Sequence, residues 1–168
     1  LELRVIRSLF NRAREWNYIK LSPVDGVKKY RLDEHEPRFL VPSEGKALIA
    51  ACKGQLRSFV IIALNTGLRK GELFNLQWQD ISFNRRELRV RKAKGKKYRV
   101  IPLNQMALEN LESHPRHPKS PFVFHNTNGS QRRDIRNAFN AALRDAKLPH
   151  IRIHDLRHSF ISNLVMAG

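Results

Sequence analysis

The apolar positions at the start of the chain recur at close to the period of an α-helix. They predict a helix over residues 1–20, ended by Ser22-Pro23 and Asp25-Gly26; the apolar positions are Leu3, Ile6, Leu9, Phe10, Ala13 and Trp16. A polar stretch with two prolines follows at residues 31–42 and predicts a linker. Because one helix cannot bury its apolar face alone, we expect residues 1–30 to be the C-terminal end of a larger, truncated domain.

Beyond the linker, the pattern predicts helices interrupted by a small sheet. Ser43 is a plausible N-cap for a helix that runs to about Cys52. Short runs with apolar residues at alternate positions, in residues 80–83, 87–92 and 97–103, predict a three-stranded antiparallel meander. Further helices are expected at residues 56–64, 72–78, 105–112, 131–146 and 154–167. The predicted fold class is therefore α+β, mainly α-helical, with a three-stranded antiparallel sheet.

The net charge of the chain indicates what kind of molecule it binds. The net charge of +17 predicts attraction to a polyanion, although a solubility charge or a ribosomal-type RNA-binding protein would share it. Residues 85–99 are dense in Lys and Arg and contain one acid, Glu87. We expect a nucleic-acid backbone to lie here, in contact with Arg85, Arg86, Arg91, Lys92, Lys96, Lys97 and Arg99.

Other features of the composition argue against a disulfide-bonded protein and a membrane-spanning protein. The single cysteine, Cys52, can form no internal disulfide, which favours a reducing, cytoplasmic setting. The longest strongly apolar run, residues 59–64, is too short to cross a bilayer, so no membrane partner is expected.

Two arginine motifs set far apart carry the candidate chemistry. Arg69 follows Thr66-Gly67-Leu68, where the glycine permits a tight turn, and Glu72 is three residues further on and can orient it. His154, Arg157 and His158 share one face of the last predicted helix. Two arginines, a histidine and a lysine are the groups needed to hold a phosphodiester and move protons without a metal.

Simpler interpretations of each motif stay open. A Gly-Leu-Arg tripeptide is also common at a helix start, with a solvated arginine. His154 and His158 are spaced like two zinc ligands of a metalloprotease helix, but Asp155 stands where that motif has glutamate. Taken singly, His158 could pack against the domain and His154 could cap the helix.

Together, the motifs resemble those of the tyrosine recombinase (phage integrase) family. The matching segments are Thr66-Gly67-Leu68-Arg69 with Glu72, residues 94–103 (Lys-Gly-Lys-Lys-Tyr-Arg-Val-Ile-Pro-Leu), and residues 154–160 (His-Asp-Leu-Arg-His-Ser-Phe). The resemblance spans nearly all of residues 38–168, and residues 16–23 resemble the end of that family's core-binding domain. It implies a catalytic domain over residues 43–168, incomplete at its C-terminus, with double-stranded DNA as the partner and a homotetramer on paired sites in the full-length protein.

The resemblance also implies a role for each site residue. Arg69 and Arg157 would clamp the scissile phosphate, Lys94 would be the general acid, His154 would assist proton transfer, and Glu72 would support Arg69. The assignment of Lys94 depends on aligning the Lys-Gly turn, so Lys92, Lys96 and Lys97 remain alternatives. No metal or nucleotide cofactor is implied.

The family's nucleophilic tyrosine has no counterpart here. It follows the His-x-x-Arg motif, after a further His or Trp, whereas residues 160–168 contain none of these types, and Tyr18, Tyr30 and Tyr98 all lie upstream. We therefore expect a site-specific recombinase fragment, bacterial or phage-encoded and nucleoid-associated, that cannot itself cleave DNA. The alternatives are a non-catalytic DNA-binding module and an enzyme of the type IB topoisomerase kind.

Overall fold

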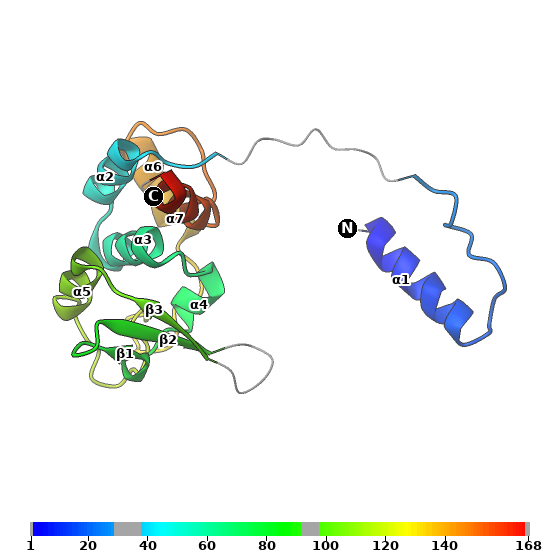
Figure 1. Cartoon of the computed structure of the whole chain (residues 1–168), viewed down its shortest axis with the longest axis horizontal. Coiled ribbons are helices and arrows are strands. Elements are labelled where there is room, and N and C mark those ends of the chain that lie inside the picture. The colour runs from blue at the N-terminus through cyan, green and yellow to red at the C-terminus, as the bar shows by residue number, and fades with distance from the viewer. Residues whose placement is uncertain (1, 29–37, 92–97, 167–168) are drawn as a thin grey trace. The chain divides into compact units, whose positions relative to one another are not determined.

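The structure is a computed structural model that describes residues 2–28, 38–91 and 98–166 (Figure 1). It consists of two compact units, Leu1–Glu36 and Pro37–Gly168, whose boundary falls within the predicted linker. None of the helices in the described residues has both the length and the apolar character needed to span a membrane.

The first unit contains α1 (Glu2–Glu15), which is shorter than the predicted helix of residues 1–20. Asn17 takes a positive φ of 60° and ends the helix there. The Tyr18 N–H donates to the Ala13 carbonyl (2.9 Å) and the Asn17 N–H to the Arg14 carbonyl (3.0 Å), the two bonds of a Schellman cap. The helix therefore ends several residues before Ser22-Pro23, at an asparagine that tolerates the left-handed conformation.

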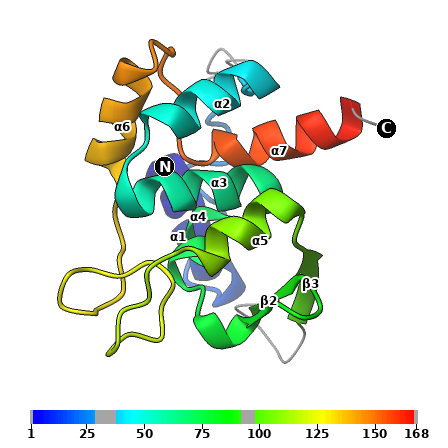
Figure 2. The ribbon, with the colours of Figure 1, turned by 90° about the vertical axis from the view of Figure 1, so that its left-hand side faces the viewer.

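The second unit is built around α3 (Gly54–Thr66), most of whose residues are buried. Figure 2 shows α3 between α7 (Asp155–Met166) and α2 (Pro42–Ala51) on one side and α5 (Gln105–Glu112) on the other. The remaining helices are α4 (Lys70–Phe74), α6 (Arg136–Asp145) and the short 3₁₀ helix η1 (Trp78–Asp80). Phe59 of α3 anchors the core, with ring centroids 5.1 Å from Phe74 and 5.2 Å from Phe124.

The predicted three-stranded antiparallel sheet is confirmed. Its order is β1 (Ile81–Ser82), β2 (Glu87–Arg91) and β3 (Tyr98–Pro102). Leu88 pairs with Ile101, and Val90 pairs with Arg99. Because side chains alternate along a strand, Arg99 and Ile101 share the face of the buried Leu88 and Val90.

The start of the second unit is fixed to α7 by two hydrogen bonds. The Leu40 N–H donates to Ser159 Oγ (2.8 Å), and Asn163 Nδ2 donates to the Leu40 carbonyl (3.2 Å). Ser159 is fully buried, and its hydroxyl donates to the Asp155 carbonyl (2.8 Å). We call the two bonds to Leu40 the Leu40 latch.

The prediction that Ser43 caps α2 is wrong. The helix begins one residue earlier, at Pro42, whose fixed φ suits the first helical position, and Val41 is the N-cap residue. Glu44 supplies the capping interaction, because its Oε2 accepts the Val41 N–H (3.2 Å).

The predicted helix over residues 72–78 is wrong in its second half. α4 ends at Phe74, and the chain then pairs with residues 121–123. The Trp78 N–H donates to the Pro121 carbonyl (3.0 Å), and the Val123 N–H donates to the Leu76 carbonyl (2.9 Å). Pairing with a segment distant in sequence has replaced the local helical bonds.

The predicted helix over residues 131–146 starts late for a similar reason. Gln131 pairs with His125, and the Arg132 N–H donates to the Phe124 carbonyl (3.1 Å), so α6 begins at Arg136. The helix ends as α1 does, with Lys147 at a positive φ of 53°.

Candidate active site

The turn between α3 and α4 places Arg69 at the edge of the second unit. Gly67 ends α3 with a φ of 60°, and its N–H donates to the Ala63 carbonyl (3.0 Å). A Cβ at this position would overlap the Phe160 ring of α7, so the glycine is required for its conformation and for its small size. Leu68 is then buried and Arg69 becomes the N-cap residue of α4.

Glu72 joins two arginines from different elements. Its Oε2 accepts the Arg69 N–H (2.8 Å), and its Oε1 pairs with Arg69 Nη1 (3.3 Å). The same Oε2 lies 2.6 Å from Nη2 of Arg99 on β3. Burial alone would raise the pKa of Glu72, but the hydrogen bonds from Arg69 and Arg99 and the charge of Arg99 lower it below its usual value. Glu72 is therefore ionised in the folded protein at neutral pH.

Arg157 reaches the same turn from α7. Its Nη1 donates to the Gly67 carbonyl, 90 residues away in sequence. Burial lowers the pKa of Arg157, and the positive charges of Arg69 and Arg99 lower it further, while Glu72 opposes them. The structure thus brings three guanidinium groups within electrostatic reach of one another around a single carboxylate.

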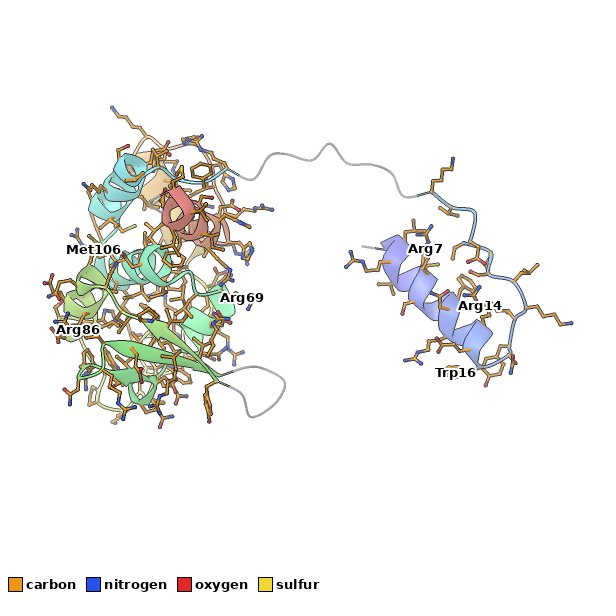
Figure 3. The ribbon with its side chains drawn as sticks, in the orientation of Figure 1. Arg7, Arg14, Trp16, Arg69, Arg86 and Met106 are labelled. Atoms are coloured by element: carbon orange, nitrogen blue, oxygen red, sulfur yellow. The ribbon has the colours of Figure 1, made fainter. Side chains whose placement is uncertain are left out.

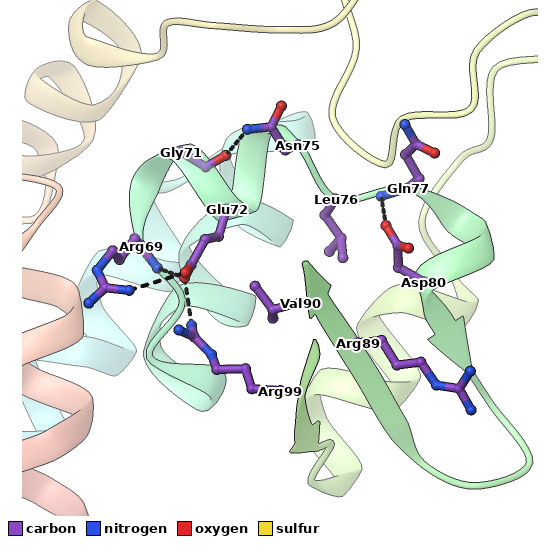
Figure 4. A pocket seen from close by; sticks show the side chains of 10 residues that line it. All are labelled: Arg69, Gly71, Glu72, Asn75, Leu76, Gln77, Asp80, Arg89, Val90 and Arg99. Atoms are coloured by element: carbon purple, nitrogen blue, oxygen red, sulfur yellow. Dashed lines mark hydrogen bonds and ion pairs between the residues drawn. The ribbon is translucent and has the colours of Figure 1, made fainter. Parts of the chain in front are cut away.

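Two neighbouring hollows meet at Arg99. One, of about 740 Å³, is lined by Arg69, Glu72, Arg89 and Arg99 among others. Figure 4 shows the side chains of Arg69 and Arg99 directed at the Glu72 carboxylate and that of Arg89 pointing away. The other hollow, of about 640 Å³, is lined by Gly67, Arg99, Arg157 and Phe160 among others. An anion entering this region would meet positive charge from three elements.

His154 lies immediately before α7, as expected for a residue at the helix start. Its side chain is exposed, its carbonyl accepts the Arg157 N–H (3.1 Å), and its ring packs edge-to-face on His158 (5.0 Å between centroids). The next residue, Asp155, is buried and accepts the Arg152 N–H (2.7 Å). Burial would raise the pKa of Asp155, but the hydrogen bonds from Arg152 lower it. Asp155 therefore orders the turn that presents His154.

Within the described ranges, the structure contains no group of three His, Cys, Asp or Glu side chains that could hold a metal ion. His154 and His158 face each other edge-to-face.

The structure describes only some of the predicted DNA-contacting residues. Arg85 and Arg86 are exposed at the β1–β2 turn, whereas Arg91 and Arg99 lie at the other end of the sheet, roughly 13 Å away along β2 at about 3.3 Å per residue. Figure 3 shows Arg86 and Arg69 on opposite sides of the second unit. Lys92, Lys94, Lys96 and Lys97, with the side chain of Arg91, fall outside the described residues, so the expected position of the general acid stays a prediction.

Of the predicted site residues, the structure brings Arg69, Glu72 and Arg157 together, with His154 one turn from Arg157. From the sequence, Arg99 was expected only among the DNA-contacting residues, and its pairing with Glu72 was not predicted. The alternation of β3 carried a signal, because Arg99 is two residues from Ile101 and so shares its face.

Comparison with known proteins agrees with this geometry. Residues 38–168 match the model of the phage integrase family. The chain is 33% identical to the integrase of Salmonella phage P22 and 30% identical to the shufflon-specific DNA recombinase of Escherichia coli. These alignments cover 99% and 100% of this chain but 46% and 44% of the relatives, so the chain spans less than half the length of either protein.

Solved structures show the same fold at lower identity. The Tn1549 transposon integrase, in complex with a circular intermediate DNA, superposes with a TM-score of 0.80 at 21% identity, over 99% of this chain and 66% of the integrase chain. A lambda integrase dimer bound to a COC′ core site gives 0.71 at 20% identity, over 95% and 63%. With the match over residues 38–168 and the arginine pair that two distant segments build, the chain belongs to the phage integrase family of tyrosine recombinases.

Proposed function

We propose that this chain is the phosphate-binding part of a site-specific DNA recombinase, which in its full-length form cleaves and rejoins strands through a 3′-phosphotyrosyl intermediate. One observation carries the proposal: Arg69 and Arg99 pair with Glu72, and Arg157 adds a third positive charge within electrostatic reach, leaving an excess of positive charge in a partly buried site. Such a site favours an anion, and double-stranded DNA is the polyanion that the net charge of +17 suits.

The roles of the residues follow from the needs of phosphodiester transfer. Arg69 and Arg157 neutralise the nonbridging oxygens, whose charge grows in the transition state, and their planar forks can each bind two oxygens. Lys94 protonates the leaving 5′-oxygen, and His154 assists proton transfer at the nucleophile. Conserving the phosphate bond energy in the protein–DNA linkage removes the need for a high-energy cofactor.

The nucleophilic tyrosine belongs to a part of the protein outside this chain. Residues 1–30 belong to the core-binding domain that helps to hold the duplex, and the full-length protein works as a tetramer on paired sites in the bacterial nucleoid. The 168-residue chain alone therefore binds DNA without forming a covalent adduct.

A nicked suicide DNA substrate tests this function. The protein extended past Gly168 is expected to give a covalent protein–DNA band on a denaturing gel, and the 168-residue chain none. Arg69→Ala and Arg157→Ala are each expected to reduce the band in the extended protein by about a hundredfold or more. Arg136→Ala removes a side chain that is 71% exposed and paired with Asp134, and should leave the band intact.

Three results would contradict the proposal. A covalent band from the 168-residue chain would show that it contains its own nucleophile. An extension without a tyrosine, and without an adduct, would identify a non-catalytic DNA-binding module. A band that forms equally well with Arg69→Ala would place the phosphate elsewhere.

A further inference from the structure

Arg99 differs from the other arginines of the basic segment in its position on the sheet. It pairs across the ladder with the buried Val90, and its side chain is 31% exposed, against 52% for Arg89 and 70% for Arg85. A cation on the covered face of a sheet needs a partner there, because burying an unpaired charge is costly. Glu72 is that partner.

Two arginines form ion pairs with the Glu72 carboxylate. Arg99 holds Oε2 at 2.6 Å, the shortest ion-pair distance in the described residues, whereas Arg69 Nη1 lies 3.3 Å from Oε1. The Arg69 backbone N–H also uses Oε2, at 2.8 Å. The pair with Arg99 therefore satisfies most of the carboxylate charge, and the Arg69 guanidinium, 59% exposed, keeps donors free for another anion.

Without Arg99, Glu72 would draw the Arg69 guanidinium away from a bound anion. A carboxylate with one remaining cation pairs with it more closely, which would turn the Arg69 guanidinium toward α4 and away from Arg157. The site would also change from three positive charges and one negative to two and one, halving its excess charge. Both changes weaken the attraction for an anion held between Arg69 and Arg157.

We propose that Arg99 is a positioning residue of the phosphate site: it neutralises Glu72, so that Arg69 is held by its backbone N–H while its guanidinium stays available to the scissile phosphate. The inference rests on the proposed function, since it assigns Arg99 a part in the same site. It also replaces the sequence-based expectation that Arg99 contacts the DNA backbone as one of a run of surface cations.

The test compares substitutions at Arg99 with a control substitution at Arg85. Arg99→Met keeps the apolar stem that lies against the sheet and removes the charge, whereas Arg99→Lys keeps a charge that can still pair with Glu72. Arg85→Met removes one charge from the β1–β2 turn, at a side chain that is 70% exposed and lines neither hollow. Inorganic phosphate is the probe, titrated into the 168-residue chain while the Arg69 and Arg157 Nε–Hε signals are followed by NMR.

Arg99→Met is expected to weaken phosphate binding by about tenfold or more, and Arg99→Lys to restore most of it. Arg85→Met should bind phosphate as the unsubstituted chain does. Affinity for a random duplex should fall only slightly, and to the same extent in Arg99→Met and Arg85→Met, because each loses one charge. In the absence of phosphate, Arg99→Met should also shift the Arg69 Nε–Hε signal, as its guanidinium moves toward Glu72.

Failure of the inference and failure of the function give different results. If phosphate binds the unsubstituted chain and Arg99→Met equally well, with both arginine signals responding, the inference is overturned while the function stands. If phosphate moves neither the Arg69 nor the Arg157 signal of the unsubstituted chain, the proposed phosphate site is contradicted. The positioning role of Arg99, which depends on that site, is then contradicted as well. A loss in Arg99→Lys as large as that in Arg99→Met would also count against a charge-based role.

Discussion

At the scale of single residues, Gly67 connects the two arginines of the site. Its left-handed conformation turns the chain toward Arg69, its carbonyl accepts from Arg157, and its missing Cβ leaves room for Phe160. Three requirements meet at one position, so a substitution there affects the turn and the seating of α7 together.

Gly67→Ala is therefore expected to destabilise the protein more than a matched glycine substitution. Gly54 has a similar φ of 52° but open space around it, so Gly54→Ala should cost only the conformational strain, about 1–2 kcal/mol. Gly67→Ala should cost a further amount of about 1–3 kcal/mol because it crowds Phe160. Urea unfolding of both variants measures the difference, and equal losses would show that Phe160 moves aside freely.

His114 makes the stability depend on pH at this same scale. It is buried, its Nε2 donates to the Val123 carbonyl (3.1 Å), and its Nδ1 accepts from Ser58 (2.9 Å), an arrangement of the neutral ring. Burial lowers the pKa of His114 from 6.5, and the charge of His125 lowers it further, against the bond to Val123. The unfolded chain therefore takes up a proton at this residue before the folded one does.

Stability is expected to fall as the pH drops below about 6.5, where unfolded His114 becomes protonated, until the lower pKa of the folded state is reached. His114→Gln, which can keep both hydrogen bonds, should flatten this part of the profile. His150→Gln changes an exposed histidine and should leave the slope unchanged. Thermal unfolding between pH 5 and 8 provides the measurement; a slope that survives in His114→Gln would assign it to other groups.

At the scale of elements, the sequence predicts helix ends correctly where residues close in sequence determine them. The helix of residues 105–112 was predicted correctly at both ends, and the Asn104 side chain caps it by accepting the Ala107 N–H (3.0 Å). The end of α4 at Phe74 and the start of α6 at Arg136 were missed because the adjoining residues pair with residues 121–125. The Glu72–Arg99 ion pair could likewise not be predicted from local sequence patterns, since it joins residues 27 positions apart.

The Leu40 latch gives a test at this scale. Ser159→Ala leaves the buried Leu40 N–H without its acceptor, which should lower the free energy of unfolding by about 1–3 kcal/mol. Ser113 is the control, because its hydroxyl makes the same bond to a carbonyl four residues earlier in an exposed position. Ser113→Ala is expected to change stability little. If the two variants lose the same amount, the latch contributes nothing.

At the scale of the whole molecule, a net charge of +17 makes DNA binding strongly dependent on salt. Removing the charges of Arg91, Lys92, Lys96 and Lys97 together should weaken binding to any duplex and reduce the slope of log affinity against log salt by about 0.9 for each phosphate that is no longer neutralised. Arg69→Ala with Arg157→Ala should leave this general affinity mostly intact. Fluorescence anisotropy at several salt concentrations compares them, and equal losses would argue against a pocket distinct from the binding surface.

The Leu40 latch has a mechanical consequence. Ser159 and Asn163 lie on the same helix as Arg157, so the backbone at Leu40, near the start of the second unit, is bonded to the element that carries one arginine of the site. Tension applied to the backbone at Leu40 is therefore delivered first to α7 and only afterwards to the rest of the core. The backbone at Leu40 and α7 form one load path, so a pull on Leu40 reaches the helix of Arg157 without crossing the sheet.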